Sequence, residues 1–207
     1  MNTNEKICLI ASSNKNKIAE VKNILQEFSY KVITPAEMAC EIEVEETADT
    51  FEGNALLKAK AYHELFPDYY ILADDSGLAI DALKGAPGIY SARYAGVGAS
   101  YPEKFKKIWN DLDKTMIPEE EWKAKFICTI AWWEVGANEA KIFRGEFEGY
   151  IIKEARGEHG FGYDPIFYLP EFEKTSAEIS PELKNSISHR GRALKKLQNY
   201  IREGGKN

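Results

Sequence analysis

The chain opens with a β-prone run that passes directly through a polar loop into a helical pattern. The run is Lys6–Ala11, and the helical pattern follows from Ile18, Val21, Leu25 and Phe28, which repeat at helical spacing. A strand that leads into a helix through so short a loop is typical of α/β proteins, in which helices pack on a sheet. The start of the chain therefore favours a fold built from alternating strands and helices.

The remaining segments alternate in a similar way. They are a helix from Thr50 to about Leu65, a buried strand at Tyr69–Ala73, a helix around Phe105–Leu112, a β-hairpin formed by Phe126–Trp133 and Ala140–Phe147, and a C-terminal helix capped by Ser188. The Gly- and Pro-rich stretch Gly85–Gly98 is expected to be a long ordered loop. Interleaved helices and strands with a late hairpin predict an α/β fold with a central mixed β-sheet flanked by helices.

The size and charge of the chain limit what it can be. Its 207 residues, 44% of them hydrophobic, suffice for a single domain over residues 1–207, compact or made of two closely packed lobes. Lys and Arg number 27 against 33 Asp and Glu, which gives a net charge of −6. Because nucleic-acid binding requires a dense basic surface, this balance argues against a nucleic-acid partner. It leaves room for a small anion in a local cationic pocket.

The sequence contains no signal for a membrane or for an oxidising compartment. The longest apolar run, Phe126–Trp133, is interrupted by Thr129 and is far shorter than the roughly 20 residues of a membrane span. Residues Met1–Ile10 lack the apolar core of a signal peptide, so we expect a cytoplasmic protein. The three cysteines are widely spaced and offer neither a disulfide framework nor a zinc site.

The loop between the first strand and the first helix is a candidate phosphate site. It consists of Ser12, Ser13, Asn14, Lys15, Asn16 and Lys17. Hydroxyls, an amide, lysines and backbone N–H groups at a helix N-terminus suit a phosphate chain. The Walker A pattern is absent, and the same residues would also serve as an ordinary polar cap, so the loop alone leaves both interpretations open.

Two further groups of polar residues suit an anion and a metal ion. Asn54 and Lys58 stand at i and i+4 of the second helix and could reach the same anion, or they could form a solvated stripe. The segment Asp74–Gly77 follows the strand at Tyr69–Ala73, at the carboxyl end where open α/β sheets bind ligands. Two adjacent carboxylates need a cation or hydrogen-bond donors to offset their repulsion. Oxygen ligands without His or Cys fit Mg²⁺, and the alternative is a pair of turn residues.

Two later segments suit recognition of a nucleobase. Phe161–Asp164 offers aromatic faces separated by a glycine and followed by a carboxylate, although it could also be a turn with two core aromatic residues. Ser188–Gly191 opens the last helix with the donors of His189 and Arg190, and Lys184 lies shortly upstream. These donors could address a carbonyl or a phosphate, or they could belong to a capped helix with a surface arginine.

Taken together and in order, these segments resemble the inosine triphosphate pyrophosphatases, which hydrolyse deaminated purine nucleoside triphosphates. The resemblance covers nearly the whole chain. It rests on Ser13–Lys17, Thr50–Ala55 with Lys58–Ala59, Ala73–Leu78, Ala86–Tyr94, Gly160–Pro165 and Ser188–Gly191. Two positions depart from the family pattern: Ser12-Ser13-Asn14 stands where Thr-Gly-Asn is frequent, and Gly53 stands where a glutamate is common before the Asn.

The resemblance implies an α/β protein of two lobes with a substrate cleft between them, usually assembled as a homodimer. It implies that Ser12 to Lys17 hold the triphosphate, that Asp75 and Glu46 handle Mg²⁺ and the attacking water, and that Ser76 contacts the substrate. The implied base pocket consists of Phe161, Gly162, Tyr163, Asp164, Lys184, His189 and Arg190.

From the residues and the resemblance together, we expect a Mg²⁺-dependent hydrolase. It would convert ITP, dITP or XTP to the monophosphate and pyrophosphate, and so remove these nucleotides from the nucleotide pool. One alternative is a non-catalytic nucleotide-binding module, which would have little need for Glu46 and Asp75 beside a triphosphate. Another is a pyrophosphatase for other modified nucleotides, against which the segment Ser188–Gly191 argues.

Overall fold

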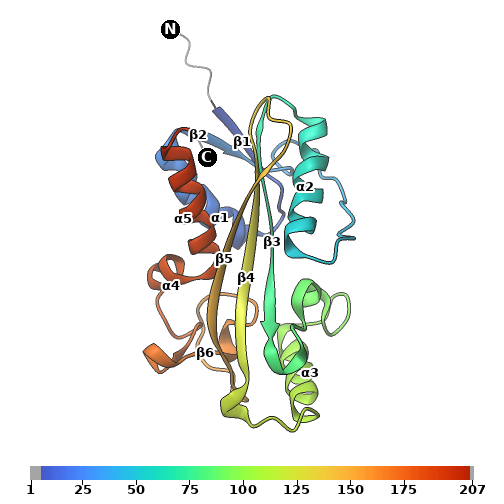
Figure 1. Cartoon of the computed structure of the whole chain (residues 1–207), viewed down its shortest axis with the longest axis vertical. Helices are drawn as coiled ribbons and strands as arrows, with labels where there is room; N and C mark the ends of the chain where they lie inside the picture. Colours follow the sequence, from blue (N-terminus) through green and yellow to red (C-terminus); the bar gives the residue numbers. More distant parts are fainter. Residues whose placement is uncertain (1–5, 206–207) are drawn as a thin grey trace. The chain divides into compact units, whose positions relative to one another are not determined.

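The computed structural model describes residues 6–205 of the chain, so residues 1–5 of the Met1–Ile10 stretch and residues 206–207 lie outside the described part. The strands are β1 (Lys6–Ile10), β2 (Tyr30–Ile33), β3 (Tyr70–Ile80), β4 (Lys123–Trp133), β5 (Lys141–Ile151), β6 (Phe167–Leu169) and β7 (Lys174–Thr175). The α-helices are α1 (Lys15–Leu25), α2 (Phe51–Leu65), α3 (Tyr101–Asp113), α4 (Pro181–Ile187) and α5 (His189–Arg202) (Figure 1). Short 3-10 helices lie at Gln26–Phe28, Asp81–Leu83, Gly88–Arg93, Glu119–Glu121, Asp164–Ile166 and Pro170–Phe172.

The strands form one mixed sheet in the order β2-β1-β3-β4-β5-β6-β7. β1 pairs in parallel with β2 and with β3, and Cys8 is opposite Val32 on one side and Tyr70 on the other. β6 pairs in antiparallel fashion with β5 and with β7. The predicted α/β fold with a central mixed sheet flanked by helices is confirmed.

Contacts within the chain divide it into two compact units. The described part of unit 1 comprises residues 6–75, 128–145 and 192–205, and unit 2 comprises residues 76–127 and 146–191. The boundary falls between Asp75 and Ser76, two consecutive residues of β3.

In unit 1, successive strand residues pack on opposite faces of the sheet, as the pleat of a strand requires. Leu9, Ile71 and Ala73 contribute to the hydrophobic cluster that contains the inner face of α2. Cys8 and Leu72 contribute to the cluster that contains residues of α1 and α5. Accordingly, Figure 1 shows α2 on one side of these strands and α1 with α5 on the other.

Unit 2 has a core of its own. Phe105, Ile108 and Leu112 of α3 are buried in a cluster that also contains Leu78 of β3 and Phe167 of β6. α3 begins with a capping box, in which the Ser100 backbone N–H and hydroxyl both donate to Glu103. The apolar spacing around Phe105–Leu112 thus identified this helix correctly.

The structure corrects the predicted end of the third strand. We expected a strand at Tyr69–Ala73 that stops before Asp74, whereas β3 continues through the polar segment to Ile80. The reason is that Leu78, Ala79 and Ile80 are themselves buried and extended. The two aspartates therefore lie in the middle of a long strand rather than at its carboxyl end.

Several elements had no counterpart among the predicted ones. These are β2, β7 and α4, which have four, two and seven residues. Short runs of this kind carry too few residues for a periodic pattern. The predicted loop at Gly85–Gly98 contains a 3-10 helix at Gly88–Arg93.

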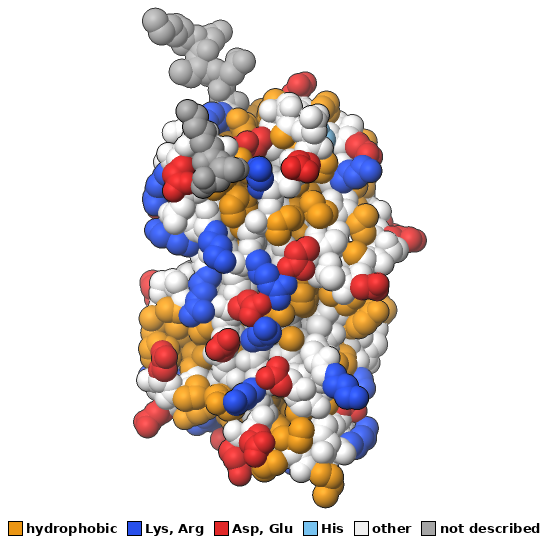
Figure 2. All heavy atoms as spheres, in the orientation of Figure 1, with side chains coloured by type: hydrophobic (Ala, Val, Ile, Leu, Met, Phe, Trp, Pro, Cys, Tyr) orange, Lys and Arg blue, Asp and Glu red, His pale blue; other side chains and the backbone are white. Residues whose placement is uncertain are grey.

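On the face drawn in Figure 2, side chains of both charges are interspersed. Acidic side chains lie among the lysines and arginines on the face drawn in Figure 2, so no continuous basic surface covers that face. Among residues 6–205, no helix is long and apolar enough to cross a membrane.

Candidate active site

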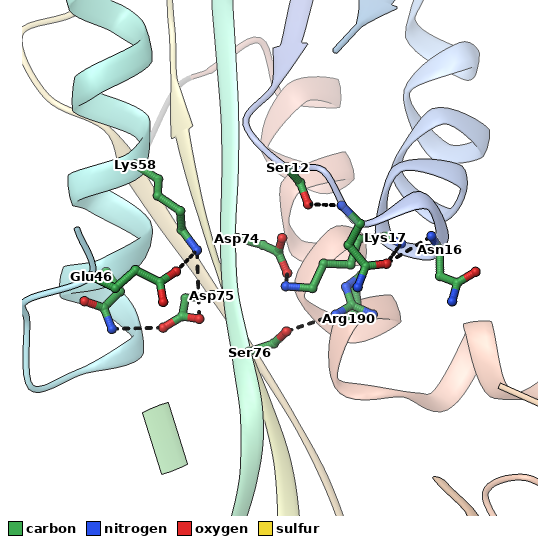
Figure 3. A network of polar contacts seen from close by, with 11 residues as sticks. Ser12, Asn16, Lys17, Glu46, Lys58, Asp74, Asp75, Ser76 and Arg190 are labelled. Carbon is green, nitrogen blue, oxygen red and sulfur yellow. Dashed lines mark hydrogen bonds and ion pairs between the residues drawn. The ribbon is translucent and has the colours of Figure 1, made fainter. Parts of the chain in front are cut away.

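The loop between β1 and α1 is held by its own side chains. The side-chain oxygen of Asn14 accepts hydrogen bonds from the backbone N–H groups of Asn16 and Lys17 at 3.0 and 3.2 Å. The Asn14 N–H in turn donates to the Ser12 hydroxyl at 3.2 Å (Figure 3). Asn14 is thus the N-cap of α1, as the alternative interpretation of this loop expected.

The cap leaves polar groups of the loop exposed. Ser13, Asn14, Lys15 and Asn16 are all exposed to solvent, and Lys17 is partly buried. The loop therefore presents hydroxyl, amide and ammonium groups at a helix N-terminus, where the helix dipole favours an anion. Both interpretations of the loop, as a cap and as a candidate phosphate site, are compatible with this geometry.

Asp74 and Asp75 contact different lysines. The Lys17 ammonium of α1 lies 2.9 Å from a carboxylate oxygen of Asp74, and both side chains are largely buried. The Lys58 ammonium of α2 lies 3.9 Å from a carboxylate oxygen of Asp75. In Figure 3 the two aspartates point to opposite sides of β3, as consecutive strand residues do.

Lys58 joins Asp75 to a second carboxylate. Its ammonium lies 2.7 Å from a carboxylate oxygen of Glu46, which belongs to the segment before α2 (Figure 3). On the other side, the Asn54 amide donates to Asp75 at 3.2 Å, and Asn54 is completely buried. The predicted i and i+4 residues of α2 thus share one face, but in this structure they contact carboxylates.

The pKa values in this cluster show the cost of its burial. Burial raises the pKa of Asp75 above its usual range and the Glu46 carboxylate adds to this, whereas Lys58, Asn54 and Lys17 act in the opposite direction. Burial alone would lower the pKa of Lys58, but Asp74, Asp75 and Glu46 hold it above its usual value. Positive charge is therefore favoured beside these carboxylates.

A cavity of about 580 Å³ in unit 1 gathers many of these side chains. Its lining includes Ser12, Ser13 and Lys17 from the loop and α1, Glu46 and Lys58 from the α2 side, and Asp74 from β3. The cavity is thus lined by both cations and carboxylates. That mixture suits a ligand that carries phosphates together with a divalent cation.

The donor set fits Mg²⁺. Among residues 6–205, no group of three or more His, Cys, Asp or Glu side chains is placed to hold a metal ion. Glu46 and Asp75 provide two carboxylates around one cationic group, that of Lys58. Two carboxylates and no His or Cys suit Mg²⁺, which takes its remaining oxygens from water and substrate phosphates.

The residues expected at the base are found in unit 2. The Asp164 carboxylate accepts the Phe161 backbone N–H at 2.7 Å and also pairs with the Lys184 ammonium. Gly160 has a positive φ, and a Cβ there would lie 2.2 Å from an Asp164 oxygen. Asp164 thus fixes the loop at Gly160–Asp164 and places Lys184 beside it.

Two cations lie near Phe161, the partly buried aromatic residue of this loop. The Lys184 ammonium is 5.1 Å and the Arg190 guanidinium 5.7 Å from the centre of the Phe161 ring. Arg190 also donates to the Ser76 hydroxyl at 3.0 Å (Figure 3). His189 stacks on Phe126 with the ring centres 4.9 Å apart. These contacts bring Phe161, Lys184, Arg190 and Ser76 together.

Tyr163 and Gly162 have structural roles in this loop. Tyr163 is buried, and its hydroxyl donates to the backbone carbonyl of Ser91 at 2.7 Å. Gly162 adopts a positive φ of 75°, a backbone conformation that favours glycine. The alternative interpretation, a turn with a core aromatic residue, therefore describes Tyr163.

The family model for the Ham1 family matches residues 8–200 of the chain, which is nearly all of it. The chain belongs to the Ham1 family. The resemblance proposed from the sequence is thereby confirmed, since curated relatives carry the name dITP/XTP pyrophosphatase.

Two relatives illustrate the match to the Ham1 family. The dITP/XTP pyrophosphatase of Clostridium perfringens is 40% identical over 94% of this chain and 96% of that protein. The dITP/XTP pyrophosphatase of Bacillus subtilis is 44% identical over 95% of this chain and 97% of that protein.

Solved structures of the Ham1 family share the fold. The HAM1 protein of Coxiella burnetii superposes with a TM-score of 0.88 at 40% identity, covering 96% of this chain and 99% of that one. The Ham1 protein of Staphylococcus aureus gives a TM-score of 0.86 at 43% identity, covering 97% and 100%.

Some residues of the site were not identified from the sequence. The ion pair of Asp74 with Lys17 joins segments that are distant in the sequence. The contact of Ala48 with Asn54 is local, but it depends on how the irregular segment before α2 folds back on the helix. The signal for Asp74 was present, because one of two adjacent strand carboxylates must face away from the other. Ala48 gave no signal, since it is a small residue in a segment without regular structure.

Proposed function

We propose that this member of the Ham1 family is a Mg²⁺-dependent pyrophosphatase for deaminated purine nucleoside triphosphates. It converts ITP, dITP, XTP or dXTP to the monophosphate and pyrophosphate, and so removes these nucleotides from the nucleotide pool. The observation that carries the proposal is the convergence of Glu46 and Asp75 on Lys58, beside a cavity that Ser12 and Lys17 also line. The names of the relatives, dITP/XTP pyrophosphatase, support the same reaction.

The residues of the first loop bind the triphosphate in this proposal. Ser12, Ser13, Asn14, Lys15, Asn16 and Lys17 offer hydroxyls, amides and ammonium groups to the phosphate oxygens. Lys17 and Lys58 supply positive charge against the charge that develops on departing pyrophosphate. Positioning and electrostatics therefore provide most of the catalysis, as in other phosphoryl transfers.

Asp75 and Glu46 are the residues that would hold Mg²⁺. The ion, when bound, neutralises phosphate charge and polarises the phosphorus centre under attack. In this proposal Asp75 also orients a water molecule and accepts its proton. Burial, which raises the pKa of Asp75, and the hydrogen bond from Asn54 support this role. No covalent intermediate with the protein is required.

The residues around Phe161 read the base. Lys184, His189 and Arg190 present donors, and Phe161 offers a ring face on which a purine can stack. A 6-oxo purine presents an acceptor where adenine presents a donor, so ATP would leave buried donors unpaired. Asp75, proposed for the metal ion, and Ser76, proposed for the substrate, are consecutive residues of β3.

The remaining parts of the proposal concern the context in which the enzyme acts. We propose a cytoplasmic homodimer, in which residues 1–207 act as a single catalytic domain without a nucleic-acid partner. This part rests on the resemblance to the inosine triphosphate pyrophosphatases. Light scattering at micromolar concentration should give twice the chain mass, and a monomer mass would overturn the assembly without touching the chemistry.

The test is a panel of nucleoside triphosphates with pyrophosphate and orthophosphate detected separately. We expect ITP, dITP and XTP to give pyrophosphate in the presence of Mg²⁺, with little orthophosphate and little turnover of ATP. Stoichiometric orthophosphate with a nucleoside diphosphate would overturn the reaction. Binding without turnover would instead identify a nucleotide-binding module.

A further inference from the structure

The segment that carries Glu46 has no regular secondary structure of its own. Residues 41–48 form neither helix nor strand, and α2 begins only after Thr50. The position of the Glu46 carboxylate therefore depends on how this segment contacts its neighbours. One such set of contacts lies two residues further on, at Ala48.

Ala48 is seated on the first turn of α2. Its backbone N–H donates to the side-chain oxygen of Asn54 at 3.0 Å. A Cβ built on Gly53 would lie 2.4 Å from the Cβ of Ala48, a distance that real Cβ atoms essentially never show. Ala48 thus occupies the space that a side chain at position 53 would need.

Asn54 connects this seat to the carboxylate of Asp75. Its side-chain oxygen faces Ala48, so its amide nitrogen is directed to Asp75, to which it donates at 3.2 Å. Because Asn54 is completely buried, the loss of either partner would leave a polar group without compensation. We refer to Gly53 and Asn54, which together accommodate Ala48, as the notch.

We propose that the notch of Gly53 and Asn54 positions Glu46, because it seats Ala48 and so keeps the Glu46 carboxylate beside Lys58 and Asp75. Gly53 and Asn54 are positioning residues and need not touch the substrate. The inference rests on the proposed function only where it states that Glu46 and Asp75 serve a divalent cation.

The substitution Gly53→Ala tests the notch, because we expect it to destabilise this protein although it would stabilise an ordinary helix. Alanine is favoured over glycine inside helices, so this change normally stabilises. Here the added methyl group displaces Ala48, and we expect the melting temperature to fall by roughly 2–4 °C or more. Hydrogen exchange of the Ala48 amide should accelerate at least about tenfold, since its bond to Asn54 is weakened.

The same variant should weaken the binding of a divalent cation. The probe is Mn²⁺ with inorganic pyrophosphate, followed through the electron paramagnetic resonance signal of free Mn²⁺. Loss of residues that orient metal ligands costs about 10- to 100-fold in metal affinity, and we expect a loss in this range. The double variant Gly53→Ala with Ala48→Gly removes the overlap between the two methyl groups and should recover most of the Mn²⁺ affinity. Ala48→Gly alone measures how much the added glycine itself lowers the affinity and the stability.

A failure of the inference about the notch and a failure of the proposed function would give different results. A Gly53→Ala protein that melts higher, with unchanged exchange at Ala48 and unchanged Mn²⁺ affinity, overturns the inference. A double variant as impaired as Gly53→Ala overturns the Ala48 contact as its cause. If the unaltered protein binds no Mn²⁺ with pyrophosphate, the metal role and the proposed function both fail, whereas the exchange and melting measurements still decide whether the notch seats Ala48.

Discussion

Asp74 and Asp75 are consecutive residues of β3, yet each carboxylate contacts a lysine from a different helix. Lys17 of α1 lies 2.9 Å from Asp74, and Lys58 of α2 lies 3.9 Å from Asp75. The alternation of a strand separates the two charges, and each lysine offsets one of them. Two adjacent acidic residues can therefore have distinct tasks.

The first prediction concerns Asp75. Asp75→Asn keeps the shape of the side chain and removes its charge, so kcat should fall by roughly 10²- to 10⁴-fold. Steady-state kinetics on ITP at saturating Mg²⁺ measure this loss. Asp74→Asn is the matched control, and we expect a smaller effect on kcat because Asp74 pairs with Lys17. Near-normal kcat in Asp75→Asn would remove Asp75 from the chemical step.

The second prediction concerns Lys58. Lys58→Met leaves Glu46 and Asp75 without the cation beside them, and the melting temperature without Mg²⁺ should fall by roughly 2–8 °C. Mg²⁺ with pyrophosphate should restore more stability to this variant than to the unaltered protein. Lys60→Met, an exposed position of the same helix, is the control. If Mg²⁺ with pyrophosphate raised the melting temperatures of Lys58→Met and Lys60→Met equally, this result would contradict a metal site at Glu46 and Asp75.

The third prediction concerns pH and unit 2. Burial would raise the pKa of Asp111, but hydrogen bonds from Lys107, Lys114 and Tyr94 lower it to about 2. Since the unfolded value is about 3.9, the ionised carboxylate stabilises the folded state above that pH, and this contribution is lost as the pH falls toward 2. Asp111→Asn should cost about 1 kcal/mol at neutral pH, after allowance for solvent screening.

Denaturant unfolding of both proteins between pH 2 and pH 7 measures this difference. The gap between the unaltered protein and Asp111→Asn should be constant above about pH 5 and should close toward pH 2. A gap that stays constant over the whole range would show that the Asp111 charge contributes nothing to stability.

The fourth prediction concerns Arg190. Its guanidinium donates to Ser76 and lies near Phe161, which places it among the residues proposed to read the base. Arg190→Ala should lower kcat/KM for ITP by roughly 30- to 100-fold and for ATP much less, because a 6-oxo purine offers an acceptor at C6 where adenine carries an amino donor. Arg192→Ala, which is exposed on the same helix, is the control. Equal losses for ITP and ATP would assign Arg190 to the phosphates or to the fold.

Much of the fold could be predicted because the spacing of apolar residues shows which segments are helices or strands and which of their faces are buried. The helices α2 and α3 and the strand β1 followed from apolar spacing and from capping residues such as Thr50, whose hydroxyl accepts the Gly53 N–H. The end of β3 was placed wrongly, because Asp74 and Asp75 interrupt an apolar run without interrupting the strand. A charged residue can remain inside a strand when it has oppositely charged partners. For Asp74 and Asp75 these partners are Lys17 of α1 and Lys58 of α2.

The sequence supports a candidate site where residue type alone limits the chemistry. Adjacent carboxylates without His or Cys indicated a hard cation, and the N-terminus of α1 indicated an anion. The contacts of Ala48 with Gly53 and Asn54 were not predictable, because small residues in an irregular segment carry no pattern. The positions of Lys58 and Glu46 relative to each other likewise depend on that segment.

The most direct test of the central claim is to hydrolyse ITP in water enriched in oxygen-18 and to analyse both products by mass spectrometry. If the residues around Asp75 direct water to the α-phosphorus, one labelled oxygen should enter the inosine monophosphate and none should enter the pyrophosphate. Label in the pyrophosphate, or in released orthophosphate, would place the attack on another phosphorus and contradict the proposed reaction.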